Sequence, residues 1–242
     1  MSIRRRARGN GRKAAFCTAV VAAAGSSSRM GGEDKLLAPL NGRPVLAHTL
    51  LALEHCPEIR EIIVVTREES LLEAGRICRE FGVSKATQIR LGGASRTESV
   101  LNGVLEASEK ADLIAVQDGA RPLTTPELIS AVVQKAARTN AAAPAVPVKD
   151  TIKEAREGLV VRTPDRNTLF AVQTPQVFEA SLLKGALQRA IEDGAAPTDD
   201  CGAVERIGMS VFLVEGDERN LKITTPLDLV IAGTLLQGEE TV

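Results

Sequence analysis

Short apolar blocks alternate with longer amphipathic stretches along most of the chain. Six blocks rich in β-branched or small apolar residues are typical of strands, at 16–23, 61–67, 86–92, 112–118, 141–148 and 210–216. Five intervening stretches repeat their apolar residues at helical spacing, at 44–56, 70–81, 95–108, 126–139 and 179–193. This alternation predicts an α/β fold in which a mostly parallel sheet is covered by helices on both faces.

Local signals support these boundaries. Ser95 stands three residues before Glu98, the spacing of a capping box, and Thr125 and Thr225 each precede a proline at the first helical position. Helix stops are indicated by glycines that follow helical runs, Gly82, Gly194 and Gly208. In such sheets ligands bind beyond the carboxyl ends of the strands, so functional residues are expected just after strands.

One segment departs from the alternation. Residues 147–178 combine alternating apolar positions with a Glu157-Gly158 turn and further X-Pro steps, a pattern that predicts a β-hairpin leaving the main sheet. We expect an arm at about residues 149–173. It would serve as a dimerisation element, or else as a surface flap.

Length and composition favour one large domain. The chain has 242 residues, 44% hydrophobic and 25% charged, so a substantial core is expected. Residues 1–13 carry six positive charges and no acid, and they are expected to form a disordered basic extension before a single domain at 14–242. No apolar run is long enough for a transmembrane helix, so no membrane partner is expected.

Charge and cysteine usage narrow the function classes. The net charge is −1 although the first 13 residues are strongly basic, so the rest of the chain is acidic, and it contains no Trp or Tyr. Both features argue against a nucleic-acid-binding domain. The four cysteines show no metal-binding spacing, which indicates a reduced, cytoplasmic protein.

Two glycine-containing segments follow strands. The stretch from Gly25 to Lys35, GSSSRMGGEDK, offers backbone N–H groups and the cations Arg29 and Lys35 to a phosphate chain. It matches neither a P-loop nor a dinucleotide fingerprint, and taken alone it reads equally well as a surface turn. The Gly92-Gly93 turn exposes backbone groups that could contact a base edge.

Polar clusters follow the later strands as well. Asp118 ends the fourth strand, where a carboxylate is well placed to hold Mg²⁺ beside a triphosphate. Further clusters lie at 149–151, 165–167, 198–200 and 220–224. Each of them, taken singly, is also typical of a solvated loop.

Together these segments resemble a known family. AAAGSSSRM…K, GGASRTESV, QDGARP, PVKDTIK, DRNTLFAVQTPQVF, TDD and NLKITTPLDL are similar, in order and spacing, to the motifs of 2-C-methyl-D-erythritol 4-phosphate cytidylyltransferases. The resemblance spans about residues 16–236. It implies a three-layer Rossmann-like nucleotidyltransferase fold with a protruding β-arm, and transfer of CMP from CTP to a methylerythritol phosphate with Mg²⁺ as cofactor.

The resemblance also implies roles for individual residues. The catalytic set is Arg29, Lys35 and Lys222, which would stabilise charge on the reacting phosphates. The CTP-binding set is Ala23, Ala24, Gly25, Gly93, Ala94, Arg96, Ser99, Asp118, Ala120 and Arg121, with Asp118 also near the metal. The acceptor-binding set is Thr151, Arg166, Thr174 and Thr198. The arm would pair two subunits as a homodimer and bring Arg166 of one chain into the site of the other.

Other interpretations of the sequence remain open. The acceptor could be another polyol phosphate, such as ribitol 5-phosphate, or the chain could be a sugar-1-phosphate nucleotidylyltransferase. A basic stretch followed by an apolar run is also how a signal peptide begins, which would make this a secreted binding protein without its first strand. The basic extension could instead mark an RNA-binding protein.

Overall fold

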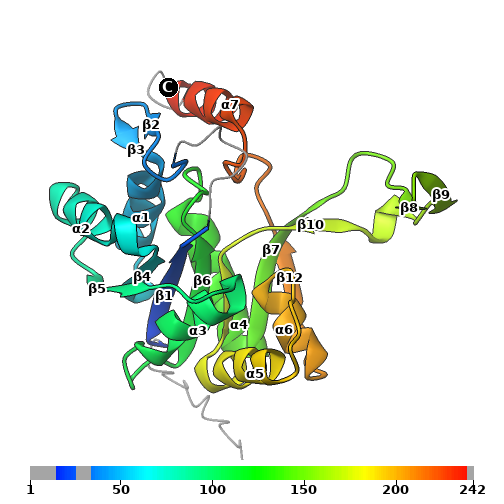
Figure 1. The fold of residues 1–242 in the computed structure, drawn as a ribbon, viewed down its shortest axis with the longest axis horizontal. Coiled ribbons are helices and arrows are strands. Elements are labelled where there is room, and N and C mark those ends of the chain that lie inside the picture. The colour runs from blue at the N-terminus through cyan, green and yellow to red at the C-terminus, as the bar shows by residue number, and fades with distance from the viewer. Residues whose placement is uncertain (1–14, 26–33, 239–242) are drawn as a thin grey trace, which may run out of the picture.

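The computed structural model describes residues 15–25 and 34–238, and its centre is an eight-stranded sheet (Figure 1). The strand order is β10-β7-β11-β6-β1-β4-β5, and β12 lies off this path and also pairs with β7. Their bounds are β1 Cys17–Ala23, β4 Ile59–Thr66, β5 Ala86–Leu91, β6 Leu113–Asp118, β7 Ala141–Pro147, β10 Phe170–Val172, β11 Gln176–Glu179 and β12 Phe212–Glu215. The pairs β1–β4, β1–β6, β4–β5 and β7–β12 are parallel, whereas β10 and β11 run antiparallel to their neighbours.

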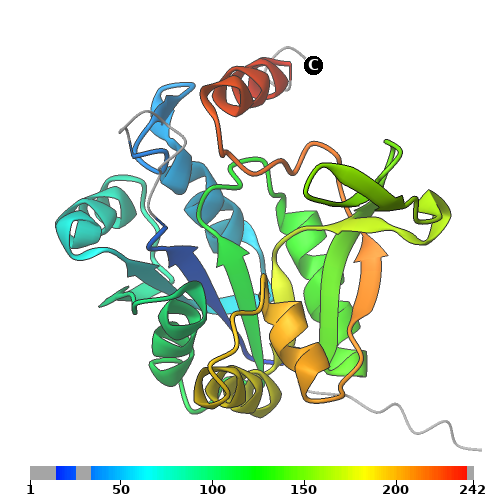
Figure 2. The ribbon, with the colours of Figure 1, turned by 45° about the vertical axis from the view of Figure 1, so that its right-hand side comes forward.

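Helices cover both faces of the sheet (Figure 2). One layer holds α1 Val45–His55, α2 Leu71–Glu80 and α4 Pro126–Thr139; the other holds α3 Arg96–Leu105, α5 Ala180–Glu192 and α6 Asp200–Arg206. The β1 strand shows why, because Cys17, Ala19 and Val21 enter one core while Val20 enters the other, and all four are fully buried. An apolar strand that is buried on both faces requires a helix layer on each side.

The five expected helices and six expected strands are all present, which confirms the three-layer fold. The elements that were not expected include α6, the antiparallel strand β11, and a small hairpin of β2 Pro39–Leu40 and β3 Arg43–Pro44. The strand β12 differs from the expectation of buried strands, since it lies at an edge and leaves Phe212 and Leu213 more than 40% exposed. The basic extension at 1–13 lies outside the described residues.

The predicted hairpin projects from the body as an arm (Figure 1). Strands β8 Glu154–Arg156 and β9 Leu159–Arg162 pair with each other and not with the main sheet. Glu157 and Gly158 both have positive φ, 51° and 81°, as a tight hairpin turn requires. The short 3₁₀ helix η2, Arg166–Thr168, lies on the return path to β10. The arm therefore leaves the sheet after β7 and rejoins it at β10.

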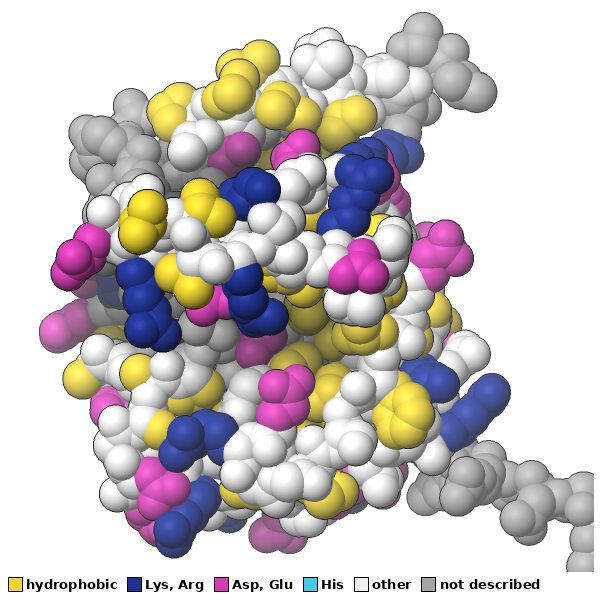
Figure 3. All heavy atoms as spheres, turned by 90° about the vertical axis from the view of Figure 1, so that its right-hand side faces the viewer, with side chains coloured by type: hydrophobic (Ala, Val, Ile, Leu, Met, Phe, Trp, Pro, Cys, Tyr) yellow, Lys and Arg dark blue, Asp and Glu magenta, His cyan; other side chains and the backbone are white. Residues whose placement is uncertain are grey.

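The last helix, α7 Pro226–Gln237, packs beside β2. The Asp228 side chain in its first turn accepts the N–H groups of Thr224 and Thr225 and so caps the start of the helix. Its outer side is apolar, with Leu227 and Val230 about two-thirds exposed. Hydrophobic side chains gather on this helix at the top of Figure 3. Within residues 15–25 and 34–238, no helix is both long and apolar enough to cross a membrane. The short helix η1, Glu68–Ser70, precedes α2.

Candidate active site

A cleft of about 400 Å³ opens where β1 and β6 end. It lies at the carboxyl edge of the parallel strands, where α/β sheets bind their ligands. Its described lining comprises Ala22, Ala23, Ala24, Gly25, Lys35, Leu36, Gly93, Ala94, Ser95, Arg96, Ser99, Asp118, Ala120 and Lys222. Most of the residues that the sequence assigned to nucleotide binding and catalysis therefore surround one cavity.

The first wall is the end of β1 and the chain that resumes after residue 33. The carbonyl of Ala23 accepts a hydrogen bond from the Thr66 hydroxyl at 3.3 Å, which ties the end of β1 to β4. An ion pair of 2.5 Å between Asp34 and Arg67 anchors the segment that places half-buried Lys35 on the cleft. Arg29 lies outside the described residues.

The second wall is the Gly92-Gly93 turn at the start of α3. A side chain at position 92 would place its Cβ 2.7 Å from the Cβ of Ala24 and 2.8 Å from the Ser99 hydroxyl, so only glycine allows this approach. The Ser99 hydroxyl accepts the Gly93 N–H at 3.0 Å. Half of the expected capping box is present. The Ser95 hydroxyl accepts the Glu98 N–H, but the Glu98 carboxylate accepts the N–H of Ala94 and not that of Ser95.

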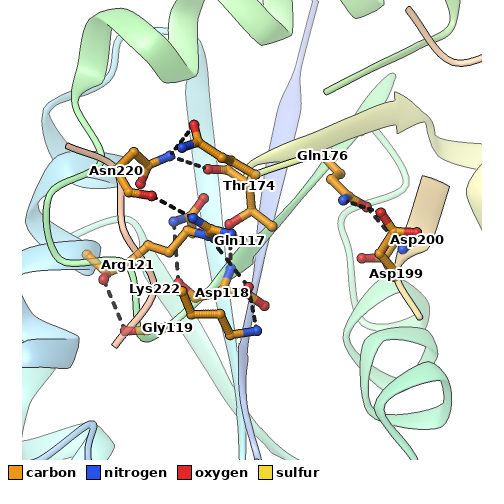
Figure 4. Close-up of polar contacts among 12 residues, drawn as sticks. Gln117, Asp118, Gly119, Arg121, Thr174, Gln176, Asp199, Asp200, Asn220 and Lys222 are labelled. Atoms are coloured by element: carbon orange, nitrogen blue, oxygen red, sulfur yellow. Dashed lines mark hydrogen bonds and ion pairs between the residues drawn. The ribbon is translucent and has the colours of Figure 1, made fainter. Parts of the chain in front are cut away.

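Asp118 forms the floor of the cleft, amid three cations, of which Figure 4 shows Arg121 and Lys222. Its carboxylate lies 2.8 Å from the Lys222 amine, 3.7 Å from Arg121 Nε and 3.8 Å from Arg96 Nη2. Burial alone would raise the pKa of Asp118, but Lys222, Arg96 and Arg121 together hold that pKa below its usual range. The carboxylate is therefore ionised at neutral pH.

Arg96 is held between two carboxylates. Its Nη2 donates to Asp200 at 2.7 Å, and the Asp200 side chain is almost completely buried at the start of α6. Burial would lower the pKa of the Arg96 guanidinium, but Asp200, and then Asp118, raise it above the usual arginine range. Gln176 fixes this end of α6, because its Oε1 accepts the N–H groups of Asp200 and Cys201, both at 3.0 Å.

Five of the predicted residues do not line the cavity. Thr174 is buried below it, and its hydroxyl accepts the Asp118 N–H at 3.0 Å, so it supports the floor. Arg121 lies behind the same carboxylate and donates to a carbonyl of the segment that carries Lys222. Thr198 is exposed before α6, and Thr151 and Arg166 lie exposed on the arm.

Among the residues in the described ranges, no group of three or more His, Cys, Asp or Glu side chains is arranged to hold a metal ion. Asp118 is the carboxylate that the cleft offers. A metal at this place would have to take its remaining ligands from water and from the phosphates of a bound substrate, which is the usual habit of Mg²⁺.

Sequence and structure comparisons agree on the relatives of this chain. Residues 17–238 match the family model for 2-C-methyl-D-erythritol 4-phosphate cytidylyltransferase. The chain belongs to this family. The enzyme of that name from Caldanaerobacter subterraneus is 44% identical over 223 residues, covering 91% of this chain and 98% of its own; the one from Halalkalibacterium halodurans is 41% identical over 222 residues, with 91% and 97% covered.

Solved structures of the family share the fold. The 2-C-methyl-D-erythritol 4-phosphate cytidylyltransferase of Thermus thermophilus is 32% identical with a TM-score of 0.76, covering 90% of this chain and 98% of its own. The 4-diphosphocytidyl-2C-methyl-D-erythritol synthase of Anaerococcus prevotii is 28% identical with a TM-score of 0.83, covering 93% and 97%. This chain is a nucleotidyltransferase of the same fold.

Sequence reasoning missed three residues of the cytidylyltransferase cleft that act from behind its surface. Asp200 and Asn220 lie in polar clusters noted in the sequence, and Gln173 lies in the DRNTLFAVQTPQVF motif, yet no role was assigned to any of the three. Their contacts are with residues 44 to 104 positions away, so their roles appear only when the chain is folded.

Proposed function

We propose that this cleft carries out the transfer of CMP from CTP to 2-C-methyl-D-erythritol 4-phosphate, giving 4-diphosphocytidyl-2-C-methyl-D-erythritol and pyrophosphate. This is the reaction of the family to which the chain belongs, a step of isoprenoid precursor biosynthesis. The observation that carries the proposal is one cavity that joins a Gly-Gly turn, the cations Lys35 and Lys222, and an ionised Asp118.

CTP would lie along the cleft from the α3 end to the β1 end. The turn formed by Gly93 and Ala94, backed by Ser99, offers backbone groups to the cytosine edge, and Arg96 holds this wall in place. A base that cannot pair with a buried backbone carbonyl leaves it unsatisfied, at a cost of about 1–3 kcal/mol. Ribose and triphosphate would follow, past Ala120, with Arg121 behind it, toward the chain at Ala23, Ala24 and Gly25.

The chemistry requires charge stabilisation more than proton transfer. The nucleophile is a phosphate oxygen of the acceptor, which is already ionised at neutral pH, so no strong general base is needed. The main barrier is repulsion between two anions, and in-line positioning beside cations lowers it. Lys35 and Lys222 lie on the cleft for this role, and Arg29 of the first loop would join them.

A magnesium ion fits this site with Asp118 as its protein ligand. The carboxylate is ionised, and one carboxylate plus substrate phosphates is an arrangement that Mg²⁺ commonly adopts. When bound, the ion would neutralise charge on the triphosphate. Lys222, 2.8 Å from this carboxylate, would lie beside the ion and contribute positive charge to the phosphates.

The acceptor site would be completed by a second subunit. We expect the acceptor to be bound by Thr198 and by Thr151 and Arg166 of the arm, while Thr174, which the sequence assigned to the acceptor, supports Asp118 from below. The arm carries apolar side chains that its own chain does not cover, among them Leu159 at 76% and Val161 at 54% exposed. Figure 3, seen from the side of the arm, shows hydrophobic side chains interspersed with charged ones on this face. A homodimer formed through the arm would cover them and place Arg166 in the partner's cleft.

A cytoplasmic location is consistent with the thiols. All four cysteines are buried and free, as expected in a reducing compartment. Burial raises the pKa of Cys78 as well as that of Cys56, so both remain protonated and unreactive. They would act as small core residues.

The test is pyrophosphate release with CTP, UTP or GTP against methylerythritol phosphate and ribitol 5-phosphate. We expect rapid release with CTP and methylerythritol phosphate, and at least about fivefold less with the other nucleotides, the lower bound of a 1–3 kcal/mol penalty. Absence of release with that pair, or a preference for ribitol 5-phosphate, would refute the assignment. Sedimentation of the protein with and without residues 150–172 tests the dimer.

A further inference from the structure

The segment that carries Lys222 has no regular secondary structure to hold it. Residues 216–224, here called the Lys222 segment, connect β12 to α7 and form neither helix nor strand. The position of the Lys222 amine therefore depends on contacts that this segment makes with the rest of the domain. Two buried amide side chains, Asn220 and Gln173, make several of those contacts, beside the backbone hydrogen bond that Ile223 donates to the Ala120 carbonyl at 2.8 Å.

Asn220 is completely buried two residues before Lys222. Its amide nitrogen donates to the Thr174 carbonyl at 3.0 Å and lies 3.4 Å from Gln173 Oε1 (Figure 4). Its backbone carbonyl accepts from Arg121 Nη1 at 2.5 Å. The Asn220 side chain thus joins the Lys222 segment to Gln173 and Thr174, and the backbone at the same position joins it to Arg121.

Gln173 holds the beginning of the same segment. Its Nε2 donates to the Asp217 carbonyl at 2.7 Å, and its Oε1 accepts the Asp217 N–H at 3.3 Å. Gly216 lies so close that a Cβ there would be 2.7 Å from Gln173 Oε1 and 2.9 Å from the backbone of Ala145. Glycine is needed for this approach, so the chain at position 216 is shaped around the Gln173 side chain.

The same two residues reach the partner of Lys222. Gln173 is followed at once by Thr174, whose hydroxyl accepts the Asp118 N–H at 3.0 Å. Asn220 bonds Thr174 from the other side. Both members of the Lys222–Asp118 ion pair, 2.8 Å apart, therefore rest on one buried cluster.

This cluster contains buried polar atoms that lower the stability of the fold, so packing alone does not explain why polar residues occupy these positions. Within the described structure the Asn220 Oδ1 is buried without a hydrogen-bond partner, as is the Oε1 of nearby Gln117. A buried acceptor without a partner is unfavourable, and an apolar side chain would avoid it. Such polar residues at a functional site point to a role in the site itself.

We propose that Asn220 and Gln173 are positioning residues for the reaction: they fix the Lys222 segment against the base of the arm and so set the Lys222–Asp118 pair. Gln173 directly follows β10, the returning limb of the arm, and Lys149 on the outgoing limb pairs with Glu218 in the Lys222 segment. The Lys222 amine thereby takes its place from the root of the arm. The inference rests on the proposed catalytic role of Lys222.

Two measurements on Asn220→Ala and Gln173→Ala test it. Because a displacement of about 1 Å costs on the order of a hundredfold in rate, we expect kcat to fall about tenfold to a hundredfold while the KM for CTP changes little. The second measurement labels lysines of the unliganded enzyme with an amine-reactive acetylating reagent and follows the peptides by mass spectrometry. Released from Asp118, Lys222 should react severalfold faster than in the parent protein, and exposed Lys184 at an unchanged rate.

The labelling result does not depend on activity, so it separates this inference from the proposed reaction. The matched control is Gln88→Ala, which removes a 3.0 Å amide bond to the Glu106 carbonyl beside β5, at the far edge of the sheet. An unchanged Lys222 labelling rate in both variants would overturn the proposal, as would an equal loss of kcat in the control. Loss of the fold in both variants would also overturn it, because the residues would then support the domain and not the ion pair.

Discussion

Replacing Asp118 by Asn should weaken the domain as well as its activity. The exchange leaves Lys222, Arg121 and Arg96, at 2.8, 3.7 and 3.8 Å from the carboxylate, without the charge that they surround. Removing one partner of a buried pair costs about 3–5 kcal/mol. Lys222 is partly exposed and can turn to water, so we expect about 2–3 kcal/mol, a fall in Tm of roughly 5–10 °C.

Thermal unfolding followed by circular dichroism measures this loss, with Glu106→Gln as the matched control. Glu106 pairs with Arg90 at 2.7 Å on the surface, where both side chains are well exposed, so its loss should cost less than about 1 kcal/mol. If Asp118→Asn lowers Tm no more than the control does, the account of Asp118 as a buried, ionised centre is refuted.

The pH dependence gives the sign of the effect. The pKa of Asp118 is lowered by folding, so its charge contributes stability above the unfolded pKa, near 3.8, and that contribution is lost as pH falls through the folded value. The difference in Tm between the parent protein and Asp118→Asn should be constant near neutral pH and shrink below about pH 5. A difference that grows on acidification contradicts the lowered pKa.

Three further variants probe separate parts of the site. Lys35→Ala should lower kcat by a hundredfold or more, about 3 kcal/mol in the transition state, with Tm unchanged; normal turnover would remove Lys35 from the mechanism. Arg166→Ala should raise the KM for methylerythritol phosphate more than that for CTP, and the reverse order would place Arg166 elsewhere. Asp200→Asn should raise the KM for CTP about tenfold, because Arg96 loses the carboxylate that holds it; an unchanged KM would make that pair structural only.

The sequence predicted the layers of the fold because its strands are apolar on both faces. A strand such as β1 can be stable only between two helix layers, and the helices carry their own capping signals. The strand β11 was missed because the four residues Gln176–Glu179 look like the end of the arm, and their place between β6 and β7 is a tertiary choice. Likewise α6 is only seven residues long, too short to show a helical period.

Site residues could be predicted where the order of strands along the chain places them, and not where their role depends on how deeply the side chain is buried. Lys35, Asp118 and Lys222 follow strands and meet at one edge of the sheet, as the topology requires. Thr174 carries the same kind of side chain as Thr198, yet one is buried under Asp118 and the other is exposed. Nothing in the sequence around them distinguishes the two positions.

A crystal structure of the protein with CTP and Mg²⁺ would show whether the cleft at the ends of β1 and β6 binds the nucleotide. We expect cytosine against Gly93 and Ala94, the triphosphate beside Lys35 and Lys222, and the metal on Asp118. A nucleotide bound away from this cleft, or bound in it with its phosphates turned toward α3, would refute the assignment of this cleft.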